Sequence, residues 1–390
     1  MPRSLTSKKA SVFTESVIRQ MTRLANLHGA VNLAQGFPDF PAPEAIKQAA
    51  CRAIQEDLNQ YAITWGAPSL RKAIASRMGR YNRVEVDPET MITVCCGATE
   101  AMISALLATV DPGDEVIIFE PFYENYGPDC VLSGATPVYY RLEPPDFAID
   151  LDRLGSLFGP RTKAIVINTP NNPTGKVYSE SELNGIAELC RRHDCLAITD
   201  EIYEYILYDG ARHVSIASLP GMDDRTITIS GHSKTFSVTG WRIGYCVAAP
   251  EITDAIRKVH DFLTVGAPHP LQAAAAQALQ FEDSFFEGLA AQYQRRRDRL
   301  MAGLRDTGFT PVEPKGAYYI MAGIDAFGFP DDVSFCRHLV EHIGVAIVPG
   351  SSFFSHPADG RGLVRFCFPK QDATLDACIQ RLGRLERLRA

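Results

Sequence analysis

The sequence predicts an α/β fold in which a mostly parallel sheet lies between helices and a smaller α+β domain follows. Two observations support this prediction. Short apolar runs recur without polar alternation, which is typical of strands buried on both faces of a parallel sheet, and helix-forming segments fit between these runs. The expected strands are Glu115–Phe119, Ala164–Ile167, Leu196–Ile198, Thr226–Ile229 and Gly244–Ala248.

Two of the connecting helices can be placed from the signals at their ends. The segment Thr99–Thr109 is expected to be helical and to stop at Asp111-Pro112-Gly113, because proline and glycine end helices. Residues Ser179–Arg192 form a second expected helix, for which Ser179 or Ser181 provides the N-terminal cap.

From about Leu289 onward, helices alternate with short strands, which predicts a second, smaller α+β domain. The expected strands there are Ala317–Met321, Val345–Val348 and Leu363–Phe368. The segment through Ala34 has too few apolar residues for a core of its own, so we expect it to complete this smaller domain. The predicted units are an N-terminal segment over 1–45, a large domain over 46–288 and a C-terminal small domain over 289–390.

Composition excludes several classes of function. The 390 residues carry 39 basic and 46 acidic side chains, a net charge of −7, which is unlike the basic surface of a nucleic-acid-binding protein. The short basic run Arg295–Arg297 is expected to form a solvated helix face. The ten cysteines include no C-x-x-C pair, and no signal peptide or membrane-spanning apolar run is evident. We therefore expect a soluble cytoplasmic protein with reduced thiols, no metal, and no membrane partner.

Polar residues follow three of the expected strands, namely Asn172, Asp200 and Lys234. Ligands of open α/β sheets bind beyond the carboxyl ends of the strands, so we expect these three side chains to meet in one site. Each residue taken singly has another explanation. Asn172 fits a turn before proline, Asp200 a helix cap or an internal ion pair, and Lys234 a surface charge.

Four motifs carry a family resemblance, and they occur in the family's order. They are Asn32–Phe40, Asn171–Gly175, Thr199–Tyr203 and Ser233–Tyr245. From about residue 30 onward the chain resembles the class I/II aminotransferases, which depend on pyridoxal 5'-phosphate (PLP). The resemblance is most specific to the branch with kynurenine, glutamine and aromatic aminotransferases. It implies fold type I, with a seven-stranded, mostly parallel sheet in the large domain.

The resemblance implies catalytic roles for Lys234, Asp200 and Tyr203. Lys234 attaches the cofactor covalently and moves the substrate proton, and Asp200 pairs with the protonated pyridine nitrogen. Asn172 and Tyr203 hydrogen-bond the phenolic oxygen of the ring. The physical chemistry agrees, because a desolvated lysine near a cation such as Arg242 can be a neutral amine and a buried carboxylate needs a cation.

The cofactor's phosphate needs hydrogen-bond donors. Gly97-Ala98-Thr99 precede a predicted helix, whose N-terminus favours anions, and Arg242 can add a bidentate contact. Gly231 departs from the family pattern, in which serine is common at this position. Either one hydroxyl contact is missing, or Ser230 and Ser233 compensate for it.

Two tyrosines complete the cofactor site that the resemblance implies. Tyr123 stands where relatives stack an aromatic ring on the pyridine. Tyr61 resembles the tyrosine that reaches the phosphate from the neighbouring subunit. A homodimer with sites at the subunit boundary is therefore expected.

The α-carboxylate of an amino acid needs a planar cation. Arg365 lies in the apolar run Leu363–Phe368 and matches the family's carboxylate-binding arginine, and an internal salt bridge is the alternative. The resemblance places Gly36, Asn168 and Asn172 near the same substrate group.

The expected reaction moves an amino group, by a ping-pong mechanism, between a 2-oxo acid and a neutral L-amino acid that is aromatic or contains sulfur. Aspartate specificity would need a further cation, but Thr99 and Thr264–Pro270 supply no Arg or Lys where relatives carry one. His269, Arg19 and Arg23 are the remaining sources of such a charge. A cysteine-conjugate β-lyase and an aspartate-type aminotransferase are alternatives. A ligand-sensing regulator would need an attached DNA-binding region, for which no pattern fits.

Overall fold

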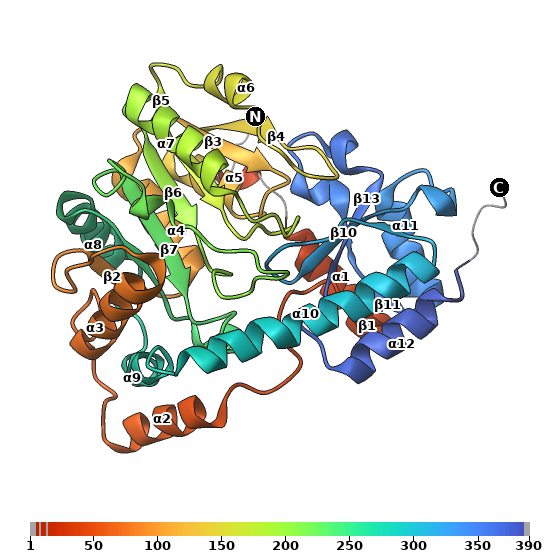
Figure 1. Cartoon of the computed structure of the whole chain (residues 1–390), viewed down its shortest axis with the longest axis horizontal. Helices are drawn as coiled ribbons and strands as arrows, with labels where there is room; N and C mark the ends of the chain where they lie inside the picture. Colours follow the sequence, from red (N-terminus) through yellow and green to blue (C-terminus); the bar gives the residue numbers. More distant parts are fainter. Residues whose placement is uncertain (1–4, 8, 13–14, 386–390) are drawn as a thin grey trace.

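A seven-stranded sheet forms the centre of the protein, whose computed structural model describes residues 5–7, 9–12 and 15–385. The strand order is β2-β8-β7-β6-β5-β3-β4 (Figure 1). The strands are β2 (Ile92–Cys95), β3 (Glu115–Glu120), β4 (Thr136–Arg141), β5 (Thr162–Asn168), β6 (Leu196–Asp200), β7 (Thr226–Gly231) and β8 (Gly244–Val247). Neighbouring strands are parallel except β8, which is antiparallel to both β2 and β7. The predicted mostly parallel α/β sheet is confirmed.

Helices cover both faces of this sheet, which explains the unbroken apolar runs. On β3, Ile117 packs in a cluster with α7 (Glu180–His193), whereas its neighbour Ile118 packs with α4 (Ala98–Thr109) and α8 (Pro250–Thr264). Successive side chains of a strand point to opposite faces, so both must be apolar here. Burying one such side chain stabilises the fold by about 2 kcal/mol.

The helix ends follow the local sequence signals. α4 begins one residue before the predicted start and ends at the predicted residue, Thr109. α7 is capped by Ser179 rather than Ser181. The Ser179 hydroxyl accepts a hydrogen bond from the backbone N–H of Glu182 at 3.2 Å, and the Glu182 carboxylate accepts one from the backbone N–H of Ser179 at 2.9 Å. This reciprocal capping box fixes where the helix starts.

The C-terminal part contains a second, antiparallel sheet of order β12-β13-β10-β9. Its strands are β9 (Thr310–Pro311), β10 (Tyr319–Gly323), β12 (Val348–Pro349) and β13 (Leu363–Cys367). The predicted single strand Val345–Val348 is instead two short strands with different partners. The first of these, β11 (Val345–Ala346), pairs with β1 (Val31–Asn32), so the N-terminal segment lies beside the C-terminal part of the chain (Figure 1).

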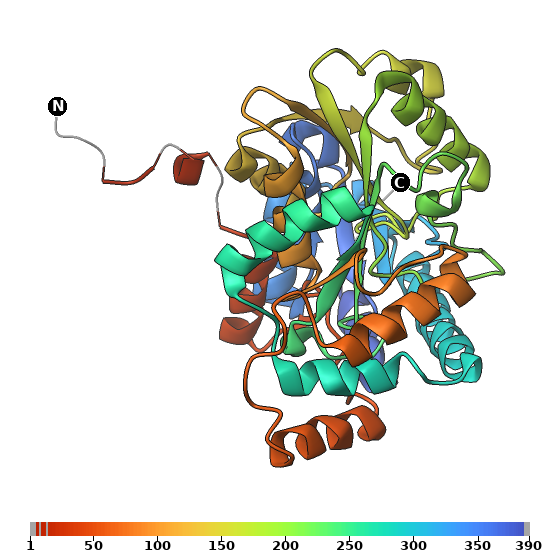
Figure 2. The same ribbon diagram turned by 90° about the vertical axis from the view of Figure 1, so that its left-hand side faces the viewer.

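The long helix α10 (Asp283–Asp306) runs from the region of the large sheet to that of the small sheet (Figure 1). The predicted domain boundary after residue 288 falls inside it, and the domain boundaries stay a prediction. At the outer edge, α2 (Glu44–Gln55) packs on α9 (His269–Ala278), as Figure 2 shows. The remaining α-helices are α1 (Val17–His28), α3 (Pro68–Arg77), α5 (Tyr126–Ser133), α6 (Leu151–Gly155), α11 (Asp332–His338) and α12 (Asp372–Leu382).

The solvated face predicted for the basic run on α10 is confirmed at Arg295, which is exposed, and is wrong at Arg297. The side chain of Arg297 is only 4% exposed and forms ion pairs with Asp209 at 2.6 Å and Asp298 at 2.7 Å. Its guanidinium also lies 4.8 Å from the centre of the Tyr208 ring. Arg297 therefore anchors α10 to the loop that follows β6. None of the described helices is long and apolar enough to cross a membrane.

Candidate active site

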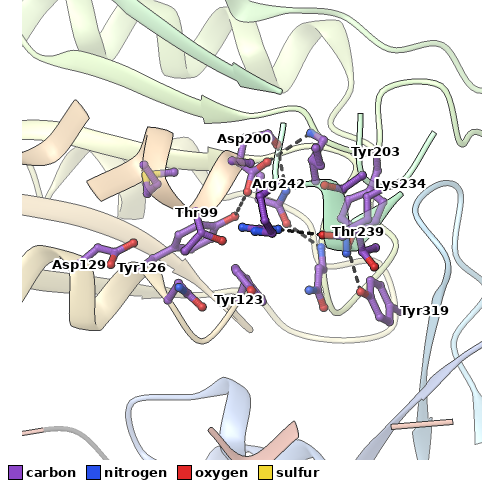
Figure 3. Close-up of a pocket in the computed structure, with 17 residues that line it drawn as sticks. Thr99, Tyr123, Tyr126, Asp129, Asp200, Tyr203, Lys234, Thr239, Arg242 and Tyr319 are labelled. Atoms are coloured by element: carbon purple, nitrogen blue, oxygen red, sulfur yellow. Dashed lines mark hydrogen bonds between the residues drawn. The ribbon is translucent and has the colours of Figure 1, made fainter. Parts of the chain in front are cut away.

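A pocket with an empty volume of about 690 Å³ lies at the carboxyl ends of β5, β6 and β7 (Figure 3). It brings together most of the residues that the sequence analysis selected. These are Ala98, Thr99, Tyr123, Asn168, Asn172, Asp200, Tyr203, Ser233, Lys234 and Arg242. The pocket thus lies where ligands of open α/β sheets bind.

Lys234 follows β7 and presents its amine to this pocket. The Nζ atom donates a hydrogen bond to the backbone carbonyl of Gly36 at 3.3 Å. Loss of solvent lowers the pKa of Lys234 to about 8; Asp200 raises this pKa, and Arg242 and Arg365 lower it. With a pKa near 8, about a tenth of the amine is neutral at pH 7, which is far more than for an ordinary lysine. Lys234 can therefore act as a nucleophile and a base.

Asp200 is the last residue of β6, and 7% of its surface is exposed. Its carboxylate accepts hydrogen bonds from the Tyr126 hydroxyl at 2.8 Å and from the backbone N–H of Ile202 at 3.2 Å. Burial raises the pKa of Asp200, while these two hydrogen bonds lower it. Within the described part of the chain, no cation forms an ion pair with it. Asp200 is therefore a buried anion suited to a cationic ligand.

Arg365 is the counterpart of Asp200, because it is a buried cation. Its guanidinium is fully buried and donates to the Asn172 side-chain oxygen at 2.9 Å and to the Ala34 carbonyl at 2.6 Å. The Nε atom has no hydrogen-bond partner. No carboxylate of the described residues pairs with Arg365, so the alternative of an internal salt bridge is wrong. The free donor fits an anionic group from a ligand.

Asn168 connects the ends of two strands. Its side-chain amide donates to the Asp200 carbonyl at 2.9 Å, and its side-chain oxygen accepts from the backbone N–H of Asn172 at 2.7 Å. Asn168 thereby holds the turn that carries Asn172. Nearby, the hydroxyls of Tyr203 and Tyr319 lie 2.9 Å apart. These contacts fix the polar groups of the pocket before any ligand binds.

The start of α4 brings free backbone N–H groups and a guanidinium together. Gly97 caps the helix with φ of +86°, and a Cβ atom at this position would lie 2.4 Å from Nη2 of Arg242. Only glycine allows this approach. The Arg242 guanidinium donates to the carbonyls of Thr239 at 3.2 Å and Cys96 at 3.4 Å, which holds it beside the helix N-terminus. Free backbone N–H groups and a guanidinium together favour a phosphate.

Gly231 ends β7, and the surrounding backbone excludes a side chain there. An added Cβ would lie 2.9 Å from the Gly244 Cα and from the Ile243 carbonyl oxygen. Ser230 does not compensate, because its hydroxyl donates to the buried carboxylate of Glu204 at 2.7 Å. Of the two serines considered, only Ser233 lines the pocket.

Several pocket residues were missed in the sequence analysis. Tyr126, Asp129, Thr239 and Tyr319 all line the pocket, and Figure 3 labels them. The centre of the Tyr126 ring lies 5.8 Å from that of the Tyr123 ring, which precedes α5, and no local spacing signals this contact. Asp129 is 6% exposed with Oδ2 unpartnered, and burial raises its pKa to about 7.

Four predicted site residues do not line the pocket: Gly36, Gly97, Arg365 and Tyr61. Gly97 lies beside Arg242, and Arg365 contacts Asn172, so both are next to residues that do line it. Gly36 presents its carbonyl oxygen to Lys234, and the Tyr318 hydroxyl donates to the same oxygen at 2.8 Å. Tyr61 is 83% exposed and does not line the pocket of its own chain.

The family sequence model for class I and II aminotransferases matches residues 29–382. The chain belongs to this family. Aminotransferases of this family depend on PLP and move an amino group between an amino acid and a 2-oxo acid.

Three relatives show how fully this aminotransferase matches known proteins. The structure of N-succinyldiaminopimelate aminotransferase from Mycobacterium tuberculosis is 42% identical with a TM-score of 0.95, over 98% of this chain and 100% of that one. Kynurenine–oxoglutarate transaminase 1 of Homo sapiens is 39% identical, over 93% of this chain and 94% of the relative. The methionine aminotransferase of Escherichia coli is 36% identical, over 95% of this chain and 96% of the relative. The fold-type-I prediction is thereby confirmed.

The pocket of this aminotransferase fits PLP. Asp200 supplies a buried anion for a cationic pyridine ring, and Lys234 supplies a partly neutral amine for an aldehyde. The turn at Gly97 and the adjacent Arg242 provide donors for a phosphate. The unpartnered Nε of Arg365 is a further buried donor, and the same guanidinium contacts Asn172, which lines the pocket.

Proposed function

We propose that this aminotransferase uses a neutral L-amino acid, aromatic or sulfur-containing, and that Lys234 is its covalent cofactor residue and base. One observation supports the site: a lysine with a lowered pKa shares a pocket with a buried anion, Asp200, and Arg365 is a buried cation beside it. Neither ion has a counter-ion among the described residues. A ligand with a cationic ring and an anionic substrate group would neutralise both.

Bound PLP supplies an aldehyde that captures the substrate amine and a ring that withdraws electrons from the substrate Cα. The Asp200 carboxylate would hold the protonated ring nitrogen. Asn172 and Tyr203 would donate hydrogen bonds to the phenolic oxygen, and Tyr123 would lie against the ring. The N-terminus of α4, Arg242 and the Ser233 hydroxyl would hold the phosphate.

Lys234 carries the proton chemistry. Its neutral amine would remove the proton from the substrate Cα, and the resulting ammonium would deliver that proton to C4′, the cofactor carbon that carried the aldehyde. Arg365 binds the α-carboxylate, which fixes the Cα in front of Nζ. Asn168 and Gly36 support this arrangement through Asn172 and the Lys234 amine. Two half-reactions of this kind, one with each substrate, give a ping-pong mechanism.

We further propose a homodimer in which Tyr61 enters the neighbouring subunit's site. Tyr61 is 83% exposed and Phe262 is 93% exposed, although both are large aromatic side chains. Leu263 and Val265 extend this apolar surface, and Val265 adopts a left-handed φ of +66°, which is rare for a β-branched residue. Large apolar side chains with this much exposure support an interface with another chain.

We also propose a cytoplasmic location and a division of the chain into two domains. All ten cysteines are free thiols, which is usual in the reducing cytoplasm. The two separate sheets support a large domain over 46–288 and a small domain over 289–390 with the 1–45 segment attached, since β1 pairs with β11.

The choice of a neutral substrate rests on side chains that could supply a further positive charge for an acidic substrate. The Nδ1 atom of His269 forms a hydrogen bond with the Gln60 carbonyl oxygen at 3.1 Å, and the Arg23 guanidinium forms an ion pair with the Glu15 carboxylate. Thr99 stands at the phosphate turn where a basic residue would serve an acidic substrate. Two of the three relatives are named for kynurenine and methionine, which supports the same choice.

A comparison of substrates tests this proposal. We expect kcat/KM for methionine, phenylalanine or kynurenine to exceed that for aspartate, with each half-reaction followed by the cofactor spectrum. Aspartate winning by more than about tenfold, or roughly 1.4 kcal/mol, would overturn the neutral-substrate proposal. The Lys234→Ala variant is the control, since it should give no reaction. Release of pyruvate and ammonia from a cysteine conjugate, without need of a 2-oxo acid, would identify the β-lyase alternative.

A further inference from the structure

A buried ion pair lies behind the phosphate-binding turn. Glu100 is the third residue of α4, and His260 lies on α8. The Nδ1 atom of His260 is 3.0 and 3.1 Å from the two carboxylate oxygens of Glu100, and its Nε2 atom is 2.9 Å from the carbonyl oxygen of Thr64. Carboxylate and carbonyl oxygens only accept hydrogen bonds, so both ring nitrogens carry protons. The pair is therefore an imidazolium facing a carboxylate.

This pair joins the proposed phosphate site of its own chain to the segment whose Tyr61 is proposed to enter the neighbouring subunit's site. On one side, Glu100 accepts from the backbone N–H of Cys96 at 2.9 Å, and the carbonyl of Cys96 accepts from Arg242 at 3.4 Å. On the other side, Thr64 lies three residues after Tyr61. An unbroken line of hydrogen bonds thus runs from Arg242 to the segment that carries Tyr61.

We propose that protonated His260 is a positioning residue that holds the Tyr61 segment in register with the phosphate-binding turn, so that its loss of charge weakens PLP binding. This inference rests on the proposed roles of Gly97–Thr99, Arg242 and Tyr61. His260 itself touches no ligand. It acts through Thr64 on one side and through Glu100 on the other.

The charged surroundings favour the imidazolium. Burial lowers the pKa of His260, but the hydrogen bond and charge of Glu100 raise it above its usual value, with smaller contributions from the Thr64 carbonyl and Asp261. Burial also raises the pKa of Glu100. The hydrogen bond and charge of His260 and the hydrogen bonds from Ser104 and the Cys96 N–H lower it, and together they exceed the effect of burial, so the pKa of Glu100 lies below its usual value.

Three further titratable or charged groups lie around the pair. Cys95 on β2 is a buried thiol whose pKa burial raises, so it stays neutral. Arg257, one turn before His260 on α8, donates to the carbonyls of Glu89 and Ile92, and Arg242 is held at Cys96. Cys95, Glu100 and His260 are close enough to share a metal ion, but hydrogen bonds already satisfy both nitrogens of His260. The cluster is therefore an ion pair.

The sign of the pH dependence follows from the raised pKa of His260. The pKa of His260 in the folded protein exceeds the ordinary value of about 6.5. The ion pair between His260 and Glu100 is therefore fully formed below pH 6.5 and is lost as the pH rises through the raised pKa. PLP affinity should lose the contribution of this ion pair over the pH range in which His260 deprotonates.

The test compares PLP dissociation constants of the full-length holoenzyme, its His260→Gln variant and the matched exposed-histidine control His28→Gln across this pH range. Below pH 6.5, His260→Gln should bind PLP about tenfold more weakly than wild type, and the ratio should fall toward one in alkali. His28→Gln should match wild type throughout. The inference is overturned if the ratio of the His260→Gln and wild-type dissociation constants does not change with pH, or if the two proteins bind PLP equally well at every pH.

A second measurement does not depend on the variant folding. In wild-type holoenzyme, amide hydrogen exchange over residues 60–66, corrected for its intrinsic pH dependence, should accelerate as His260 deprotonates, whereas that of α7 should not. Unchanged protection of residues 60–66 contradicts the inference. Failure of the wild type to bind PLP at all would contradict the proposed function instead, so the two failures are distinguishable.

Discussion

The interior of the pocket and the surface around Tyr61 belong to one proposed site, yet they are packed in opposite ways. Asp200 and Arg365 are almost completely buried and held by hydrogen bonds within the chain. Tyr61 and Phe262 are among the most exposed large side chains of the described residues. The difference indicates that one chain arranges the charged groups of the pocket in advance, whereas the outer part of the site requires a second chain.

The most damaging change to the interior is Lys234→Ala. We expect kcat to fall by about 10³-fold or more, because both covalent attachment of the cofactor and the proton transfer are lost. The fold should survive, with a circular dichroism spectrum like that of wild type. Lys163→Ala, at an exposed lysine on β5, is the matched control and should keep full activity. Near-normal turnover of Lys234→Ala would remove Lys234 from the mechanism.

Asp200→Asn should reduce kcat by about 100-fold while PLP still binds, since the ring nitrogen loses its anionic partner. The variant also removes the charge that raises the pKa of Lys234, so that pKa should fall below its value of about 8. The alkaline rise in the rate of cofactor attachment should then shift to lower pH. Steady-state rates close to those of wild type would make Asp200 structural.

The outer surface is tested by Phe262→Asp, which places a charge on the proposed interface. We expect sedimentation to show monomers, and activity to fall by about tenfold because Tyr61 no longer reaches a neighbouring phosphate. Tyr61→Phe should remain dimeric and lose part of the PLP affinity. A stable monomer with full activity would contradict the dimer proposal and leave the interior as the whole site.

Tyr126→Phe is the mildest change, because it removes only one hydrogen bond to Asp200. A loss of about 1 kcal/mol, or roughly fivefold in kcat/KM, is expected. The Tyr126 hydroxyl lowers the pKa of Asp200, so its removal raises that pKa and the acidic limb of the pH–rate profile should move to higher pH. An unchanged acidic limb would show that Tyr126 only packs against its neighbours.

The sequence alone determined the features that depend on local signals. Unbroken apolar runs located the strands at or just after whose carboxyl ends Asn168, Asp200 and Lys234 lie. Ser179 marked a helix start because Glu182, its partner in the capping box, is three positions away. Motif residues such as Arg365 were identifiable because the family pattern fixes them by position.

Only the tertiary structure decided which groups meet. The Tyr126–Asp200 hydrogen bond spans 74 residues and the Arg365–Asn172 contact spans 193, so neither leaves a trace in local spacing. The same holds for Arg297, whose ion pair with Asp209 spans 88 residues and buries a charge that composition assigns to the surface. Such contacts depend on strand order and helix packing, which the whole chain sets together, whereas caps and strand ends depend on a few neighbouring residues.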